Sequence, residues 1–386
     1  MTLCKHRLGL PKSATNVVIH SEEALDIPSI TNLYTEAHNT SHARTRLQGD
    51  SIINEVLDHT LNREAEYVRG QTTTTAEKVF RETIHLNTTD NTIPTFTGSR
   101  AKHLTHTFNT NIKTKVKDAT RRKEQESLKS HVEKLQVQGG LLALAAREKI
   151  DLVWKSSMFQ LKSGTLKFML NACIDTLPTP ANLKRWKFGA SDKCKLCGNR
   201  ATTNHIMNCC SVMLNTGRYT WRHNNIINYV VTNVDSKFKV YSDLPGWEAP
   251  GGGSIPSELC LTRLKPDIVI VDEKKKTLHI YELTVPLTMN IDQRHTEKTQ
   301  KYTPFLTDIT NHSCTVNCFE VSSTGYINPR NKATLTTLAS FLKKDIKKSS
   351  FLANINSLAW YGSYQLWLTR EDKEFVAPPF LIPHLD

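Results

Sequence analysis

The chain has 386 residues, with 50 Lys and Arg against 37 Asp and Glu, and therefore a formal net charge of +13. Hydrophobic residues make up 38% and charged residues 23%, a balance typical of folded domains and not of a disordered chain. The longest apolar run, Leu141 to Ala146, is far shorter than the ~20 residues that a membrane-spanning helix needs, so we expect no membrane partner. Nine cysteines without a secretory signal predict reduced or metal-bound thiols.

The positive charge is concentrated in the middle of the chain. Residues 100–223 hold 23 basic and 8 acidic residues, a net charge of +15, whereas the two flanks together carry −2. Such a block predicts a surface that faces nucleic-acid phosphates, because Lys and Arg neutralise them and release counterions. The alternative is a solvated basic face without a partner. The candidate contacts are Arg121, Arg122, Lys123, Lys184, Arg185, Lys187, Lys193, Lys195 and Arg200.

Hydrophobic periodicity predicts mostly helices before residue 245. Apolar residues recur at helical spacing in Ser29 to Ala43, Ser51 to Glu66, Leu141 to Leu177 and Ser211 to Val234. Arg100 to Leu135 is dense in Lys and Arg and predicts a long solvated helix that ends before Gly139 and Gly140. Pro245 to Pro256 is rich in Pro and Gly and is the main predicted domain boundary. After it the pattern becomes strand, hairpin, helix, strand and helix.

We therefore expect a mixed α+β protein in four parts. Residues 1–99 form a helical region and residues 100–186 a basic helical linker. Residues 187–235 hold a small zinc knuckle with a following helix, and residues 236–386 form a C-terminal α/β domain.

The zinc knuckle rests on the spacing C-x2-C-x7-H-x4-C, formed by Cys194, Cys197, His205 and Cys210. Two thiolates separated by two residues fit one tetrahedral zinc ion, and four protein ligands leave no open position, which indicates a structural metal. His205 and Cys210 are expected on one face of a helical turn. Cys209, next to Cys210, remains a rival fourth ligand.

A pair of acids is predicted at one end of a β-hairpin. Asp267 precedes the apolar run Ile268 to Val271, and a second strand follows from Thr277 to Val285. If the hairpin folds about the bond between Lys274 and Lys275, the residue numbers of each cross-strand pair sum to 549. Asp267 then lies opposite Glu282. Two carboxylates at such a short separation repel one another unless a cation such as Mg²⁺ or Mn²⁺ binds both. The alternative is a solvent-exposed strand end with two unrelated acids.

The next predicted helix adds a lysine to this pair. Ile291, His295 and Tyr302 fall on one side of a helical wheel, with Lys298 among them and Lys301 on the flank. A lysine on a core-facing side needs a partner, which the two carboxylates supply. Glu248 or Glu258 is a candidate for a further acid from a helix. Two acids and a lysine around a hairpin favour metal-assisted phosphodiester hydrolysis.

These features together resemble the C-terminal part of the protein encoded by site-specific non-LTR retrotransposons of the restriction-like-endonuclease type. Proteins of that family carry a reverse transcriptase, then a C-C-H-C knuckle, then an endonuclease of the PD-(D/E)XK class. Besides the knuckle, the resemblance covers Asp175 to Trp186, Lys265 to Asp267, Glu282 to Pro286 and Lys298 to Tyr302. It implies a thumb-like remnant in residues 1–99 and a restriction-endonuclease-like domain in residues 236–386.

The resemblance also implies an activity. Asp267 and Glu282 take the catalytic Mg²⁺ or Mn²⁺, and Lys298 with Lys301 take the lysine roles. In this family the lysine migrates from the strand to the helix, which accounts for Thr284 where an E-x-K motif has Lys. The implied protein is a Mg²⁺-dependent DNA endonuclease that nicks a target site in the nucleus after cytoplasmic synthesis. Its partners are target DNA and, as a second candidate, the RNA of the element.

One expected part is missing from the resemblance. A complete protein of this family has a polymerase palm with a Tyr-x-Asp-Asp box, and this sequence contains no Asp-Asp pair. Leu8 to Lys12 fits the start of the thumb, so we expect a truncated relative without polymerase activity. Two alternatives to an active endonuclease are a catalytically inactive nucleic-acid-binding remnant and a nonfunctional relic of the element.

Overall fold

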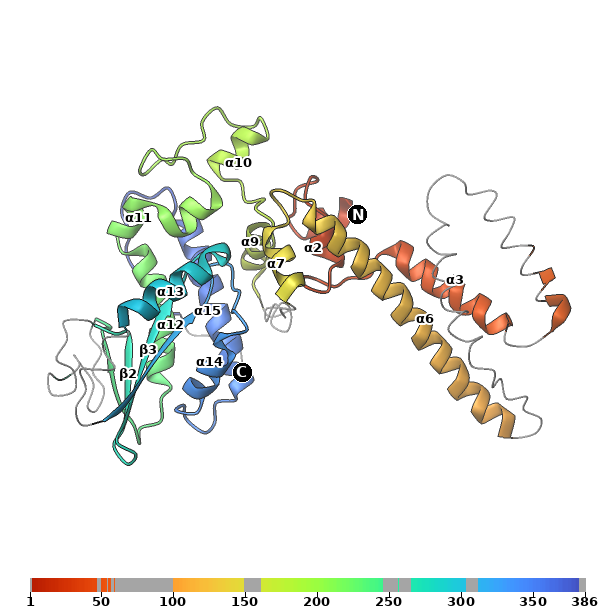
Figure 1. Cartoon of the computed structure of the whole chain (residues 1–386). Coiled ribbons are helices and arrows are strands. Elements are labelled where there is room, and N and C mark those ends of the chain that lie inside the picture. Colours follow the sequence, from red (N-terminus) through yellow and green to blue (C-terminus); the bar gives the residue numbers. More distant parts are fainter. Residues whose placement is uncertain are drawn as a thin grey trace. The chain divides into compact units, whose positions relative to one another are not determined.

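A computed structural model of the chain describes residues 2–46, 50–53, 55–56, 59, 100–148, 161–245, 256, 265–302 and 312–381. It divides into two compact units, one of residues 17–134 and one of residues 1–16 with 135–386 (Figure 1). Most of the predicted helix from Ser51 to Glu66 lies outside the described residues. None of the helices in the described part of the chain is both long and apolar enough to cross a membrane.

The unit of residues 17–134 is helical. It contains α2 (Val17–His20), α3 (Ile30–Arg46) and α6 (Arg100–Glu133), and α6 confirms the predicted long polar helix. Because α6 has few apolar anchors, polar contacts supplement its packing against the segment after α2. Gln125 donates from Nε2 to the carbonyl of His20 (3.0 Å) and accepts from the N–H of Glu22 (2.9 Å). Arg121 forms an ion pair with Asp26.

The other unit combines helices with one small sheet. Before the sheet come α1 (Thr2–Arg7), α7 (Gly140–Glu148), α9 (Ser163–Cys173), α10 (Pro180–Arg185), the π-helical turn η2 (His205–Cys209), α11 (Ser211–Asn215) and α12 (Arg218–Thr232). The sheet consists of β1 (Lys239–Ser242), β2 (Ile268–Asp272), β3 (Thr277–Thr284) and β4 (Ser313–Glu320). Between β3 and β4 the chain forms the 3-10 turn η3 (Thr288–Asn290) and α13 (Ile291–Tyr302), and after β4 come α14 (Asn331–Ala339) and α15 (Lys348–Leu368). The protein is thus mixed α/β, as predicted.

The strand order is β1-β2-β3-β4, with β1, β2 and β3 antiparallel and β3 and β4 parallel. Ile268 pairs with Tyr281 and Val269 with Ile280, which confirms the predicted hairpin register. The turn is stabilised by Asp272, whose Oδ1 accepts from the N–H groups of Lys274 (3.1 Å) and Lys275 (3.2 Å), a turn geometry that Asp side chains favour. Helix α13 lies in the connection between the parallel strands, which a hairpin could not join.

Both faces of the sheet are covered, and this explains the continuous apolar run of β2. On one face Val269, Ile280 and Leu278 pack with Tyr302 of α13. On the other face Ile268, Ile270 and Leu283 pack with residues of α12, α14 and α15 (Figure 1). All five residues of β2 are buried, as expected for a strand between two layers. The predicted acid pair lies at the end of β2 and β3, on the α13 face.

The long C-terminal helix α15 is packed against a glycine turn. Gly325 adopts a left-handed φ of +74°, and a Cβ added there would lie 1.8 Å from Nε1 of the buried Trp360. Gly217 has a nearly identical φ of +76°, yet an added Cβ there would meet nothing within 4 Å. Both glycines adopt a left-handed φ that a residue with a side chain rarely takes. Of the two, only Gly325 also lacks space for a Cβ atom.

We expect Gly217→Ala to lower the free energy of unfolding by about 1 kcal/mol, the cost of a left-handed side-chain-bearing residue. Gly325→Ala should lower it by about 2–4 kcal/mol, because overpacking against Trp360 is added to that cost. Urea unfolding followed by circular dichroism measures both. Equal losses for the two variants would show that the indole ring yields without cost.

Candidate functional site

The four predicted zinc ligands lie together. The metal-binding atoms of Cys194, Cys197, His205 and Cys210 are all within 4.8 Å of one another. The Sγ atoms of Cys194 and Cys210 are 4.0 Å apart, and Sγ of Cys197 is 3.2 Å from Nε2 of His205. Tetrahedral Zn–S bonds of about 2.3 Å give sulfur–sulfur separations of about 3.8 Å, so this set fits zinc. The neighbouring Cys209 is exposed and is not part of the cluster, which decides the fourth ligand in favour of Cys210.

Two local turns bring the ligands together. In the first, Gly198 adopts a φ of +74° while its N–H donates to the carbonyl of Cys194 (2.9 Å), which turns the chain between the first two thiols. In the second, His205–Cys209 forms a π-helical turn. This differs from the α-helical turn implied by the sequence analysis: His205 and Cys210 are five positions apart, and an i→i+5 turn suits that separation better than an α-turn.

The ionisation of the ligands fits a cation in their midst. Burial raises the pKa of the Cys210 thiol to about 11. Burial also acts to raise the pKa of Cys197, but hydrogen bonds from Asn199, Cys210 and Cys194 outweigh it and lower the pKa. Burial lowers the pKa of His205, which favours the neutral imidazole that binds metals. Bound zinc would stabilise the thiolate form of the cysteines, which burial disfavours at Cys210.

The upstream phrase Asp175 to Trp186 is bound to this knuckle. Thr203 donates a hydrogen bond to the carboxylate of Asp175, and the Ala181 N–H donates to the carbonyl of Ala201 (3.2 Å). Within the phrase, Asn182 donates to the carbonyls of Asp175 (3.0 Å) and Leu177 (2.9 Å). The phrase therefore forms part of the knuckle's structural support.

Helix α12 contacts the knuckle through two side chains. The hydroxyl of Tyr219 accepts from the N–H of Cys210 (3.0 Å) and donates to the carbonyl of Ile206 (2.9 Å). Arg222, 2% exposed, donates to the carbonyl of Met207 (3.0 Å) and to Oδ1 of Asn208 (3.1 Å). These contacts hold the backbone within the π-helical turn and directly after it.

The predicted acid pair and lysine meet at the end of β2 and β3. The N–H of Asp267 donates to Oε2 of Glu282 (3.1 Å), in agreement with a register that sets the two residues opposite each other. Oδ2 of Asp267 accepts from the N–H of Leu283 (2.8 Å), and Lys298 of α13 forms an ion pair with Oε1 of Glu282. A further side chain joins them: Nε2 of His223, from α12, lies 3.1 Å from Oδ2 of Asp267.

Glu282 is buried and Asp267 is partly buried, and the ionisation of the two carboxylates reflects this. Burial, and next the negative charge of Asp267, raise the pKa of Glu282. Burial also opposes the ionisation of Asp267, but His223, the Leu283 N–H and Lys298 outweigh it and lower the pKa of Asp267. Burial acts to lower the pKa of His223, but the charge and hydrogen bond of Asp267, together with Asn224 and Glu282, outweigh it and raise the pKa. The carboxylate pair therefore retains a repulsion that a bound cation would relieve.

The remaining predicted site residues are placed differently. Nζ of Lys301 lies 3.4 Å from the hydroxyl of Tyr302, and its side chain is exposed at the rim of the site. Tyr302 donates to the carbonyl of Lys265 (3.2 Å). Glu248 and Glu258 lie outside the described residues. His223 was missed because it lies 44 positions before Asp267, and no spacing rule links the two.

Several of the basic candidates form ion pairs at the surface. Lys184 and Arg200 share Asp192 at 3.1 and 3.7 Å, and Lys195 pairs with Glu371. These three side chains are exposed, as are Arg122, Arg185, Lys187 and Lys193. The knuckle thus keeps positive side chains at its surface, although surface ion pairs neutralise part of their charge.

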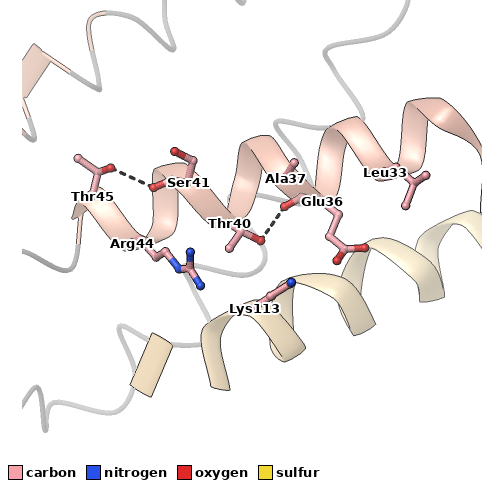
Figure 2. Close-up of a pocket in the computed structure, with 8 residues that line it drawn as sticks. All are labelled: Leu33, Glu36, Ala37, Thr40, Ser41, Arg44, Thr45 and Lys113. Atoms are coloured by element: carbon pink, nitrogen blue, oxygen red, sulfur yellow. Dashed lines mark hydrogen bonds between the residues drawn. The ribbon is translucent and has the colours of Figure 1, made fainter. Parts of the chain in front are cut away.

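A shallow groove lies in the unit of residues 17–134, between α3 and α6 (Figure 2). Its volume is about 440 Å³, and it is lined by Leu33, Glu36, Ala37, Thr40, Ser41, Arg44, Thr45 and Lys113. Two of its hydroxyls are used within α3, since Thr40 donates to the carbonyl of Glu36 (2.6 Å) and Thr45 to that of Ser41 (3.0 Å). The groove therefore offers two cations and one acid on an open surface, without convergent chemistry.

We expect the wild-type chain to retain about one zinc ion per molecule through dialysis. Cys210→Ser should lose this zinc, because serine replaces a thiolate ligand with a hydroxyl, whereas the adjacent Cys209→Ser should keep it. Elemental analysis of the purified proteins measures the zinc content. Zinc loss in Cys209→Ser with retention in Cys210→Ser would contradict the ligand set.

Comparison with known families agrees with the knuckle. Residues 127–216 match a family model described as zinc-binding in reverse transcriptase, a segment that includes all four ligands. No curated protein matches the chain. The matched segment and the Cys₃His cluster support Zn²⁺ and fit a protein related to retrotransposon reverse transcriptases.

Proposed function

We propose that this protein is a retrotransposon-derived DNA endonuclease that hydrolyses phosphodiesters with Mg²⁺ or Mn²⁺. The observation that carries the proposal is the group formed by Asp267, Glu282 and Lys298 at one end of the sheet, where Glu282 is buried and the other two are partly buried. Two carboxylates face each other across a hairpin, and the ammonium group of a lysine on the next helix contacts one of them. This is the composition of a phosphoryl-transfer site. The domain with this group would act on nuclear DNA.

The donor set supports a hard divalent cation. Both acids supply only oxygen atoms, the ligands that Mg²⁺ and Mn²⁺ prefer. Burial, and next the negative charge of Asp267, raise the pKa of Glu282, and such an ion would offset the repulsion between the two acids. When bound, the ion would polarise the phosphate and lower the pKa of a water molecule.

The other residues of the site orient these groups. His223 and the N–H of Leu283 both hold Oδ2 of Asp267, which leaves its Oδ1 directed elsewhere. Lys298 is held by its ion pair with Glu282, and its positive charge would stabilise the negative charge that develops on the phosphate. Lys301, exposed at the rim, is suited to contact a neighbouring phosphate of the substrate.

Binding of the substrate is assigned to the basic middle of the chain. Residues 100–223 carry a net charge of +15, and the knuckle keeps Arg185, Lys187 and Lys193 exposed. The residues that follow position 223 are nearly neutral, with 18 basic and 17 acidic side chains. This distribution favours a division in which the middle binds DNA, or RNA of the element, and the C-terminal domain cleaves the DNA.

A nucleic-acid-binding remnant without cleavage is the second candidate, and one observation favours it. Both oxygens of Glu282 and one oxygen of Asp267 already have hydrogen-bond or ion-pair partners within the protein. A carboxylate pair satisfied in this way can serve as a structural contact between the sheet, α12 and α13. Cleavage and binding assays separate the two candidates.

We expect the wild-type protein to nick supercoiled DNA in Mg²⁺ and not in EDTA. Asp267→Asn should slow nicking by at least about 100-fold, because it removes a metal-binding charge. Asp272→Asn, at the opposite end of β2, is the matched control, since Asn keeps the acceptor that stabilises the hairpin turn. Equal nicking by wild type and Asp267→Asn would remove Asp267 from the site. DNA binding without any nicking by the wild type would favour the remnant.

DNA affinity should fall as salt rises. Replacing Arg185 and Lys193 with Ala should reduce the slope of log Kd against log salt concentration by about 2, close to one unit for each lost phosphate contact. The same change at Lys344 and Lys348, exposed lysines of the near-neutral C-terminal part, should leave the slope unchanged. Fluorescence anisotropy with a labelled duplex measures the slopes. Equal effects of both pairs would contradict a specific role for the knuckle.

A further inference from the structure

A second buried acid lies beside the carboxylate–lysine site. Glu320, the last residue of β4, is fully buried, and its Oε1 lies 2.8 Å from Nδ1 of His295 on α13. Its Oε2 is 3.6 Å from Nη2 of Arg330 and has no hydrogen-bond partner among the described residues. The guanidinium of Arg330 is shared with Asp292, whose Oδ1 it meets at 2.7 Å.

The register places this group on the same face as the first. Glu282 of β3 pairs with Cys318 of β4, and Thr284 pairs with Glu320. Because alternate residues of a strand share a face, Glu320 lies on the Glu282 side of the sheet, about 7 Å further along the strands. On α13, His295 precedes Lys298 by three positions, so the two side chains are neighbours on the helix surface.

The burial of the Glu320 carboxylate is more destabilising than a purely structural contact between β4 and α13 requires. A buried carboxylate is destabilising unless its oxygens are well paired, and within the described part of the chain Oε2 of Glu320 has only the longer ionic contact with Arg330. An apolar residue at the end of β4 would anchor α13 as well. What Glu320 adds is control of His295: it engages Nδ1, fixes the orientation of the ring and leaves Nε2 as the nitrogen that can exchange a proton. The side chain of His295 is 31% exposed, so a substrate can approach the ring.

We propose that His295, held by Glu320, donates the proton that the leaving oxygen takes up when the phosphodiester is cleaved. This inference rests on the proposed endonuclease function. Hydrolysis needs a proton removed from water and a proton delivered to the leaving group, and the carboxylates, with the ion that they would hold, are assigned to the water. The water oxygen forms a bond to phosphorus while the P–O3′ bond breaks and its electron pair stays on O3′. O3′ takes the proton of Nε2, the attacking water releases a proton to solvent, and the ring regains one from solvent.

The test compares two substrates that differ only in the leaving atom. One duplex has a normal linkage at the cleaved position, and the other has sulfur in place of the bridging 3′ oxygen. A thiolate leaves without protonation, so it does not need a proton donor. Both are cleaved in Mn²⁺, which tolerates sulfur better than Mg²⁺ does. The variant is His295→Asn, because the Asn side-chain amide can still donate to Glu320 and cannot deliver a proton.

We expect His295→Asn to slow cleavage of the normal linkage by about 100-fold or more and to leave the sulfur linkage within a few-fold of wild type. His279→Asn is the matched control: Nδ1 of His279 is engaged by Thr315 (2.8 Å) on β4, and its ring packs with Phe341 on the opposite face of the sheet. It should behave as wild type on both substrates. Thermal unfolding and DNA affinity, measured without divalent ions, should be similar for the three proteins.

The outcomes distinguish a failure of the proton-donor role of His295 from a failure of the endonuclease function. Normal cleavage by His295→Asn, or an equal loss on both substrates, overturns the proton-donor role while the endonuclease stands. If the wild type cleaves neither substrate, the proposed function fails and the role of His295 fails with it.

Discussion

The buried guanidinium of Arg222 is the contact on which the C-terminal half of the protein depends. Its Nη1 donates to the carbonyl of Met207 (3.0 Å) and to Ser363 of α15 (3.1 Å), and its Nη2 donates to Asn208 and to the carbonyl of Val285 at the end of β3 (both 3.1 Å). Burial lowers its pKa to about 10, so the group remains charged at neutral pH. One side chain thereby joins the zinc knuckle, the sheet and the C-terminal helix. Removing it would leave several buried acceptors unpaired, each at a cost of about 1–3 kcal/mol.

Helix α12 extends this connection to the proposed chemistry. Tyr219 holds the backbone at Cys210, Arg222 holds the π-helical turn, and the next residue, His223, contacts Asp267. The zinc site and the carboxylate pair are therefore supported by adjacent residues of one helix. Neighbouring Gly362 of α15 allows the close approach, because a Cβ there would lie 2.5 Å from Cγ of Arg222. A knuckle assembled around zinc thus contributes to the position of the carboxylates.

The parts of the site that the sequence predicted are those in which a few residues decide the geometry. The thiols of Cys194 and Cys197 are joined by a short turn, and the hairpin register followed from the polar turn at Lys274 and Lys275. The stripe on α13 set Lys298 toward Glu282 because helical periodicity holds over a few turns. The π-helical turn was not predicted, since a single turn with i→i+5 hydrogen bonds has no clear sequence pattern.

Sequence alone thus determined three of the zinc ligands, the facing acids and the lysine, because spacing within one turn, hairpin or helix limits where side chains lie. The choice of Cys210 over Cys209 as the fourth ligand came from the structure. Only the tertiary structure decided which distant groups complete these sites. His223 meets Asp267, Arg222 meets Val285, and Glu320 meets His295 through the packing of α12 and α13 against the ends of the strands. No periodicity connects residues in separate elements. Their contacts are set by which faces pack together, and so by the burial of the apolar surface of the whole unit.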